Sequence, residues 1–192
     1  MDQLSFYSAE ASRPRIRDLA GLLCGPGQAV GFGRGTAARL SVVVEETWRA
    51  RALVAACTVR GVQAEVGTSE EGHPLVRTAF RSDLTGLAGQ WLRGAVKSVP
   101  PDYTPDGLAL RIWSLAAGSL DPGGYLLGLD PHAPGTHEPL AAALARSGLP
   151  ARPTRRGAPA LRITGRRRLE RLAELVGPVP DGAIERTWPL AG

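Results

Sequence analysis

Two stretches of this sequence repeat one pattern, and the repeat limits the fold more than any other feature. VRTAFRSDLTGLA at 76–88 lies over LRITGRRRLERLA at 161–173, an offset of 85 residues. GVQAEV at 61–66 lies over GLPARP at 148–153 at an offset of 87, and Gly27 lies over Gly118 at an offset of 91. Because loops accept length changes readily, the shrinking offset indicates a duplicated unit whose second copy has shorter loops.

The hydrophobic spacing of the first copy predicts the order helix, strand, strand, helix, strand, strand, helix. The expected elements are a helix over 13–24 with Ser12 as its N-cap, a hairpin that turns near Arg34, a helix over 47–60, two strands within 62–80, and a helix capped by Ser82 that continues to Val96. In the second strand of the hairpin, alternation predicts Leu40 and Val42 on one face and Arg39 and Ser41 on the other.

The second copy repeats this order after a proline-rich linker. The expected elements are a helix over 108–118, a tight hairpin within 119–130, a helix over 136–148, two strands within 149–164 and a last helix over 166–177. The predicted organisation is a first repeat over 8–98, a linker over 99–106, a second repeat over 107–179 and a C-terminal tail over 180–192. The fold class is therefore α+β.

The composition is that of a folded protein, with 43 % hydrophobic and 21 % charged residues. No run approaches the roughly 20 apolar residues that span a bilayer, and Asp2 stands where a signal peptide carries positive charge. We therefore expect a cytoplasmic protein without membrane contact. Cys24 and Cys57 lie in apolar helical patterns, which favours buried thiols over a disulfide or a metal pair.

Arginine dominates the charge of the chain. Of the 23 basic residues, only Lys97 is a lysine. Nine of the arginines lie between Arg146 and Arg171, where the single acid is Glu170. This density favours contact with phosphate or another polyanion, and the alternative is a solvated basic surface.

The first helix and its end spell part of a known motif. LAGLLCGPG at 19–27 is similar to the L-A-G-L-I-D-A-D-G motif of LAGLIDADG homing endonucleases, and so is the order of elements in each copy. The resemblance implies two tandem α-β-β-α-β-β-α repeats that form a pseudo-twofold saddle over DNA. It also implies that the two motif helices pack side by side through small residues. The interface residues expected from it are Ala20, Leu23, Gly27, Ser114, Ala117 and Gly118.

In that family, an acidic residue just before the last glycine of each motif binds the divalent metals that cleave DNA. The matching positions here are Pro26 and Ala117, and neither side chain can bind a metal. The resemblance therefore implies no catalytic residue, no metal and no cofactor, and we do not expect an enzyme. A residual metal-dependent endonuclease is the weaker alternative.

A second candidate for metal binding is the segment DPHAPGTHE, which holds Asp130, His132, His137 and Glu138. A loop followed by the acidic first turn of a helix explains the same residues more simply. We therefore expect no metal site there.

The second copy is similar to WhiA-type regulators of bacteria, whose N-terminal part is a degenerate, cleavage-deficient pair of LAGLIDADG units. The segment at 115–153, LAAGSLDPGGYLLGLDPHAPGTHEPLAAALARSGLPARP, carries this resemblance. WhiA-type proteins continue into a helix-turn-helix module, whereas PDGAIERTWPLAG follows the last helix here. Promoter recognition by such a module is therefore not expected.

Strand alternation, within the fold that the resemblance implies, selects the side chains that face DNA. Arg binds phosphates, and Arg, Gln and Thr bind base edges, so outward side chains of these types suit a duplex. Three arginines open the last helix, where its dipole disfavours cations, and this placement favours a phosphate partner. With only 5 % aromatic residues, base stacking on single strands is not favoured. The predicted DNA-binding residues are Arg39, Arg77, Arg152, Thr154, Arg155, Arg156, Arg162, Arg166, Arg167 and Arg168.

The leading hypothesis is a non-catalytic protein that binds double-stranded DNA, as a transcription regulator or a nucleoid-associated factor. The alternative is a protein-interaction or dimerisation module, in which the same surface binds a partner protein or a second copy of the chain.

Overall fold

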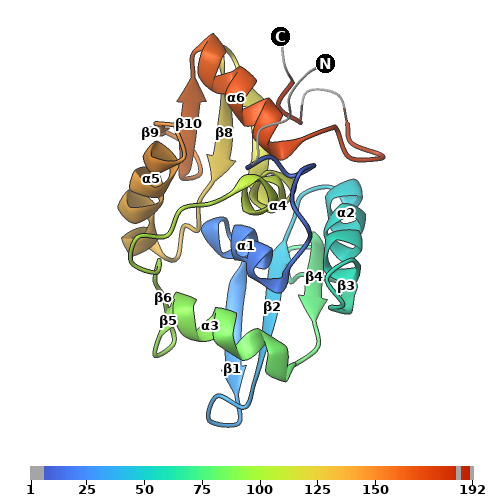
Figure 1. Cartoon of the computed structure of the whole chain (residues 1–192). Helices are drawn as coiled ribbons and strands as arrows, with labels where there is room; N and C mark the ends of the chain where they lie inside the picture. Colours follow the sequence, from blue (N-terminus) through green and yellow to red (C-terminus); the bar gives the residue numbers. More distant parts are fainter. Residues whose placement is uncertain (1–6, 185–186, 191–192) are drawn as a thin grey trace.

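The computed structural model describes residues 7–184 and 187–190, and it contains two copies of one unit (Figure 1). The first copy consists of a 3-10 helix at Ile16–Leu19 that continues into α1 (Ala20–Cys24), then β1 (Gln28–Phe32), β2 (Ala37–Val43), α2 (Thr47–Thr58), β3 (Ala64–Thr68), β4 (Pro74–Thr78), a 3-10 turn at Ser82–Leu84 that continues into α3 (Thr85–Trp91), β5 (Leu92–Arg93) and β6 (Val96–Lys97).

The second copy repeats this order up to its last helix. It consists of α4 (Gly107–Ala117), β7 (Gly118–Asp121), β8 (Gly124–Gly128), a 3-10 turn at Pro134–Thr136, α5 (His137–Arg146), β9 (Arg152–Pro153), β10 (Ala160–Thr164) and α6 (Arg166–Val176). Each copy forms one antiparallel sheet, with strand orders β1-β2-β4-β3 and β7-β8-β10-β9. The expected α+β tandem repeat is confirmed.

Strand pairing reproduces the three offsets found in the sequence. The matching pairs are Gln28–Ser41 with Ser119–Leu126, Ser41–Arg77 with Leu126–Arg162, and Glu65–Arg77 with Arg152–Arg162. These pairs relate β1 to β7 by 91 residues, β2 to β8 and β4 to β10 by 85, and β3 to β9 by 87. The letter pattern and the hydrogen-bond register therefore describe the same duplication.

The two motif helices, α1 and α4, pack against each other at the centre of the molecule, with one sheet on each side (Figure 1). A side chain on Gly21 would collide with the carbonyl oxygen of Ala109, so glycine sets the closeness of the helices there. A side-chain carbon on Gly25 would lie 3.2 Å from the Trp113 ring and 3.6 Å from Ala117. Small residues therefore permit the close approach that the resemblance implied.

Two of the expected interface glycines serve other contacts. A side chain on Gly27 would strike the carbonyl of Leu22, to which the Gly27 N–H donates a hydrogen bond of 2.8 Å. A side chain on Gly118 would strike the hydroxyl of Tyr125. Gly27 is thus needed for the turn out of α1 and Gly118 for packing on β8. The other expected interface residues, Ala20, Leu23 and Ser114, are buried, and Ala117 is partly exposed.

The first helix begins later than the sequence predicted. Helical structure starts at Ile16 rather than at residue 13, and Ser12 is not its N-cap. The residue before the helix, Arg15, is extended and its N–H donates to the Asp18 carboxylate at 2.6 Å. Asp18 is buried and also accepts from Arg60 at 2.9 Å. The local contact between the Arg15 N–H and Asp18 therefore caps the helix, and the tertiary ion pair with Arg60 holds that carboxylate in place.

The last helix of the first copy ends earlier than predicted. It stops at Trp91, and residues 92–97 form the small hairpin β5–β6, in which Val96 is exposed. Ser82 is the first residue of the preceding 3-10 turn rather than a cap. Gly94 has a φ of 65°, a conformation that glycine adopts without strain, and this permits the turn.

The linker packs on the core through Tyr103. The Tyr103 ring meets Trp91 edge-on at a centroid distance of 5.0 Å, and its hydroxyl lies 3.8 Å from the Cys24 sulfur. Cys24 and Cys57 are both free and buried, as expected. Burial raises the pKa of Cys24 to about 12 and that of Cys57 to about 11, so both thiols are neutral at neutral pH. None of the helices described is long and apolar enough to cross a bilayer.

Candidate nucleic-acid interface

Helices cover one face of each sheet and leave the other face uncovered. In β2, Leu40 and Val42 are buried while Arg39 and Ser41 are partly exposed, as alternation predicted. The strand register then identifies the side chains that share the uncovered side of the first sheet, here termed the first open face. They are Gln28, Val30, Phe32, Arg39, Ser41, Val43, Glu65, Leu75 and Arg77.

The second sheet follows the same rule. Leu161 and Ile163 of β10 are buried, so their neighbours in the strand lie on the second open face. Pro153 lies in the two-residue edge strand β9 and is exposed. The second open face consists of Ser119, Asp121, Leu126, Arg152, Arg162 and Thr164.

The arginines of the two open faces differ in their partners. The guanidinium groups of Arg77 and Arg152 make no hydrogen bond or ion pair with the described residues. Arg39 lies over the Phe80 ring at 4.7 Å. Arg162, the counterpart of Arg77, pairs with Asp121 at 2.8 Å and donates to the Pro122 carbonyl at 2.6 Å. Three guanidinium groups on these faces thus lack an anionic partner in the described chain, and the fourth is held by the β7–β8 hairpin.

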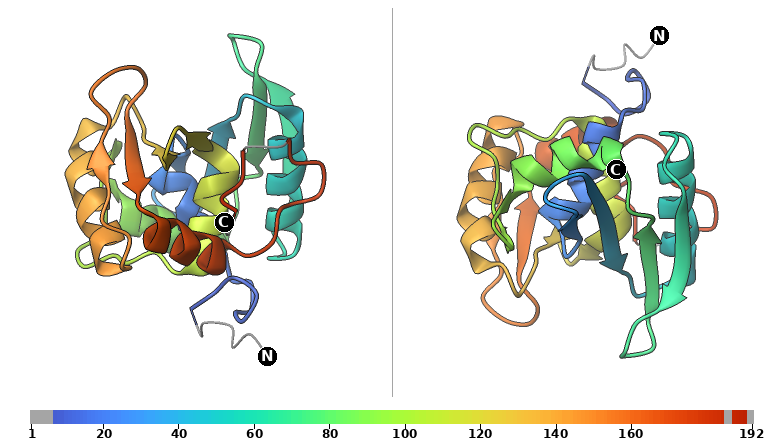
Figure 2. Two further views of the ribbon diagram at one scale, coloured as in Figure 1. Left: turned by 90° about the horizontal axis from the view of Figure 1, so that it is seen from above. Right: turned by 90° about the horizontal axis from the view of Figure 1, so that it is seen from below.

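The loop between β9 and β10 carries two more arginines without a partner in the described chain, Arg155 and Arg156, and both are exposed. Thr154 was expected to face DNA, but its hydroxyl accepts from the Ala160 N–H at 3.1 Å and lies 3.3 Å from the Ala158 carbonyl. Thr154 therefore closes the loop. In Figure 2 this hairpin and the β3–β4 hairpin project to the same side, away from the N-terminal segment.

The three remaining predicted arginines lie elsewhere. Arg166, Arg167 and Arg168 form the first turn of α6, which directly follows β10 (Figure 1). All three are exposed, and Arg166 pairs with Glu170 at 2.8 Å. They stand at the end of the sheet opposite the β9–β10 loop. The structure therefore brings Arg152, Arg155 and Arg156 together and separates them from this triplet.

The acid positions of the motif lie at equivalent points of the two copies. α1 ends at Cys24, and Gly25, Pro26 and Gly27 lead into β1, whereas α4 ends at Ala117 and continues directly into β7. Because the register matches the first residue of β1 with the second of β7, Pro26 and Ala117 correspond. Neither position carries a carboxylate.

A buried lysine binds the end of α1 beside Pro26. The ammonium group of Lys97 donates to the carbonyls of Gly25 at 2.9 Å and Gly27 at 2.6 Å. It also pairs with the Asp130 carboxylate at 2.8 Å, and both side chains are almost fully buried. The Gln28 amide donates to the same carboxylate at 2.6 Å. A protein cation thus neutralises the carbonyl end of the first motif helix.

A buried arginine binds the end of α4 in the same way. Arg49, from α2, donates to the carbonyls of Ser114 and Leu115 at 3.0 Å and of Gly118 at 2.6 Å, and it pairs with Glu46. Glu46 follows β2 just as Asp130 follows β8. Each motif helix therefore ends on a cation, and the acid that pairs with this cation belongs to the copy that does not contain the helix. The acid is Asp130 for α1 and Glu46 for α4.

In the DPHAPGTHE segment, which the sequence offered as a candidate for metal binding, Asp130 makes internal contacts. Burial alone would raise the pKa of Asp130, but the Lys97 ammonium, the His132 N–H and the Gln28 amide outweigh it and hold the pKa below its usual value. The His137 ring lies 2.7 Å from the Asp130 carbonyl oxygen, and the His132 side chain is exposed. Within residues 7–184 and 187–190, no three His, Cys, Asp or Glu side chains are grouped to hold a metal.

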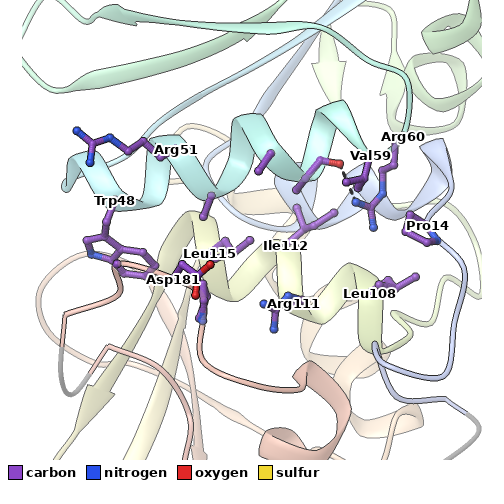
Figure 3. Close-up of a pocket in the computed structure, with 15 residues that line it drawn as sticks. Pro14, Trp48, Arg51, Val59, Arg60, Leu108, Arg111, Ile112, Leu115 and Asp181 are labelled. Carbon is purple, nitrogen blue, oxygen red and sulfur yellow. Dashed lines mark hydrogen bonds between the residues drawn. The ribbon is translucent and has the colours of Figure 1, made fainter.

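A hollow of about 670 Å³ lies between α2 and α4, near the terminal segments (Figure 3). Its floor is apolar, and three arginines line it. Arg60 is paired with Asp18, and Arg111 donates to the carbonyls of Val176 and Pro178 at 2.7 Å. Two of the three guanidinium groups are therefore engaged internally, and this hollow offers less free positive charge than the open faces.

Sequence reasoning missed the residues that complete the site. Lys97 was noted only as the single lysine, and Arg49 was not singled out. Phe32 and Phe80 form an exposed pair with ring centroids 5.3 Å apart on the first sheet. Phe32 stands near a hairpin turn and could have been found from the period of β1, but the pairing with Phe80 depends on the sheet register.

Comparison with solved structures shows the fold. The homing endonuclease I-WcaI, in a structure bound to its DNA recognition sequence, has a TM-score of 0.61 and 16 % identity, covering 86 % of this chain and 81 % of that one. The N-terminal LAGLIDADG domain of DUF199/WhiA has a TM-score of 0.55 and 15 % identity, covering 85 % of this chain and 82 % of that one.

Full-length DUF199/WhiA from Thermatoga maritima has a TM-score of 0.57 and 15 % identity over 84 % of this chain, which spans 54 % of that protein. The sequence matches no protein-family model and no curated protein. The LAGLIDADG and WhiA resemblance expected from the sequence is therefore confirmed at the level of the fold.

Proposed function

We propose that this chain binds double-stranded DNA across its two open faces without cutting it, and that it acts as a regulatory or nucleoid-associated protein. The observation that carries the proposal is the set of arginines without an anionic partner on and beside these faces. They are Arg39, Arg77, Arg152, Arg155 and Arg156.

Duplex DNA suits these side chains. Phosphates are the main targets of arginine at protein–DNA interfaces, and strands presented in a groove supply base contacts. A solved neighbour with the same fold is bound to its DNA recognition sequence. The exposed β9–β10 loop would add two cations at the edge of the second face.

The absence of cutting is supported by the ends of α1 and α4. A divalent metal needs oxygen ligands, usually carboxylates together with substrate phosphate. Here Pro26 and Ala117 supply none, while Lys97 and Arg49 bind the neighbouring carbonyls. The carbonyl oxygens at both helix ends are therefore already bound by a side-chain cation of the protein.

The test is a salt titration of binding to a labelled, fully paired duplex, followed by incubation with Mg²⁺. We expect retention at low salt, with the logarithm of affinity falling linearly with the logarithm of salt concentration. The duplex should remain intact with Mg²⁺ and with EDTA alike. Failure to retain the duplex at low salt would refute DNA binding, and nicking that EDTA abolishes would refute the non-cutting role.

The alternative is a protein-interaction surface on the first open face. Its specific support is apolar exposure, because Phe32 is 63 % exposed and Val30 and Val43 are more than 40 % exposed. Sedimentation distinguishes the two functions. A stable dimer that no longer retains DNA would favour the protein-interaction surface.

A further inference from the structure

The pairing between β2 and β4 is irregular beyond the C-terminal end of β4. Ser41 pairs with Arg77, but the next bridge joins Ala38 to Arg81, so β4 has one more residue than β2 over this stretch. The Leu40 N–H, which would otherwise meet a strand carbonyl, donates to the Thr78 hydroxyl at 3.0 Å. This is a β-bulge in which the Thr78 side chain accepts the hydrogen bond of the Leu40 N–H. Bulges commonly redirect a side chain.

The bulge places Phe80 beside the open-face residues. Its ring lies 5.3 Å from that of Phe32, with the planes tilted by 46°, and the Arg39 guanidinium covers it at 4.7 Å. Phe80 is 40 % exposed. An aromatic ring of this size, partly in water beside an arginine, presents a stacking surface.

A hollow of about 380 Å³ opens next to this ring, within the range of roughly 300–1,000 Å³ typical of small-molecule sites. We term it the Phe80 hollow. It is lined by Arg39, Gln63, Ala64, Glu65, Arg77, Thr78, Ala79 and Phe80.

The polar side chains of the Phe80 hollow are available to a ligand. The side chains of Gln63, Glu65 and Arg77 make no hydrogen bond or ion pair with the part of the chain that the structure describes. Gln63 offers both a donor and an acceptor, Glu65 only acceptors and Arg77 only donors. Together with one aromatic wall, these groups match the flat face and mixed edge of a nucleobase.

The second copy has Gly165 where the offset of 85 residues places Phe80. Its strand β10 ends at Thr164 and continues through Gly165, whose φ is 95°, into α6, with no aromatic residue at the corresponding place. The two copies have therefore diverged at this point, and the first open face has an aromatic ring beside it where the second has a glycine.

We propose that the Phe80 hollow binds an unpaired base of the DNA, stacked on Phe80 and recognised along its edge by Gln63, Glu65 and Arg77. The inference rests on the proposed function. A phosphate alone does not explain the hollow, since Glu65 repels it and Phe80 contributes nothing to its binding. A base uses the ring face, the carboxylate and the amide at once.

The experiment compares the full chain on three labelled duplexes of one sequence. The first is fully paired, the second has one unpaired adenosine, and the third has the same extra nucleotide without its base. Because stacking on one aromatic ring contributes substantially, we expect about tenfold tighter binding of the second than of the other two. The third duplex controls for flexibility, which it shares with the second.

Two variants locate the preference. Phe80→Leu should remove it while leaving affinity for the paired duplex within about twofold, because the phosphate contacts remain. Gln63→Ala, a change at an exposed surface residue, should alter the ranking among unpaired adenosine, guanosine, cytidine and thymidine. Leu126→Ala, on the second open face, is the matched control and should keep the preference.

Two results would overturn the proposal. One is equal binding of the duplexes with and without the unpaired base, and the other is an equal loss on all three duplexes in Phe80→Leu. If the paired duplex itself is not retained at low salt, the proposed function fails instead. If it is retained and the unpaired base adds nothing, only the Phe80 hollow loses its assignment.

Discussion

Changing Arg77, Arg152 and Arg156 to glutamate is expected to weaken the binding of duplex DNA by at least about 100-fold at low salt. Each change removes a guanidinium group without an anionic partner in the described chain and places an anion on or beside an open face. The plot of log affinity against log salt should become shallower by about 3, because each lost phosphate contact lowers the slope by about 1. Duplex retention measured over a series of salt concentrations checks both values.

The matched control changes the charge equally at exposed arginines away from these faces. Arg13, Arg17 and Arg51 lie on the N-terminal segment and on α2. Changing these three to glutamate should leave the slope within about 1 of that of the wild-type chain. If both triple variants bind equally weakly, net charge rather than the open faces governs binding.

Replacing Lys97 with methionine is expected to lower the free energy of unfolding by about 3–5 kcal/mol. The change leaves the buried Asp130 carboxylate without its ion pair and leaves the carbonyls of Gly25 and Gly27 without their donor. Urea unfolding followed by circular dichroism measures the loss. It is large because an unpaired buried charge costs more than the pair contributes.

A double-mutant cycle with Asp130→Asn separates the pair from its surroundings. Asparagine keeps the oxygen that accepts from the His132 N–H, but it carries no charge and has an NH2 group in place of the oxygen that accepts from the Gln28 amide. The double variant Lys97→Met with Asp130→Asn should therefore be less destabilised than the sum of the two single variants. Strict additivity would contradict a direct interaction between the two side chains.

The same pair sets an expected pH dependence. Because folding lowers the pKa of Asp130, the folded state binds its proton less readily than the unfolded state does. The stabilisation from Asp130 is therefore complete above its usual pKa of 3.8 and is lost as the pH falls through the lowered value. Unfolding measured at several acidic pH values should show a smaller decline in Asp130→Asn than in the wild-type chain.

Elements with a regular period were predictable from the sequence. The alternation in β2 and β10 identified Arg39 and Arg162 on the uncovered faces, because a strand places successive side chains on opposite sides. Boundaries were less predictable. The first helix starts at Ile16, where the Arg15 N–H donates to Asp18. The sequence did not show that Arg60, 42 residues away, holds this carboxylate in place.

The candidate site was predictable only in part. Strand position correctly placed Arg77 and Arg152 on the open faces, but it did not distinguish Arg77 from Arg162, which Asp121 holds. Thr154 has the residue type of a DNA contact, yet its hydroxyl closes a loop. Residue type and strand alternation predict which side chains face outward. The internal contacts of each side chain decide whether it is free to bind a ligand.

The sequence by itself determined the duplication and the absence of carboxylates at Pro26 and Ala117, because short matching stretches show the first and single motif positions show the second. Only the tertiary structure decided what occupies the two helix ends and where the aromatic hollow lies. Lys97 binds Gly25 from 72 residues away, and Arg49 binds Ser114 from 65 residues away. Contacts at such separations follow from how the two copies pack, and neither spacing nor periodicity records them.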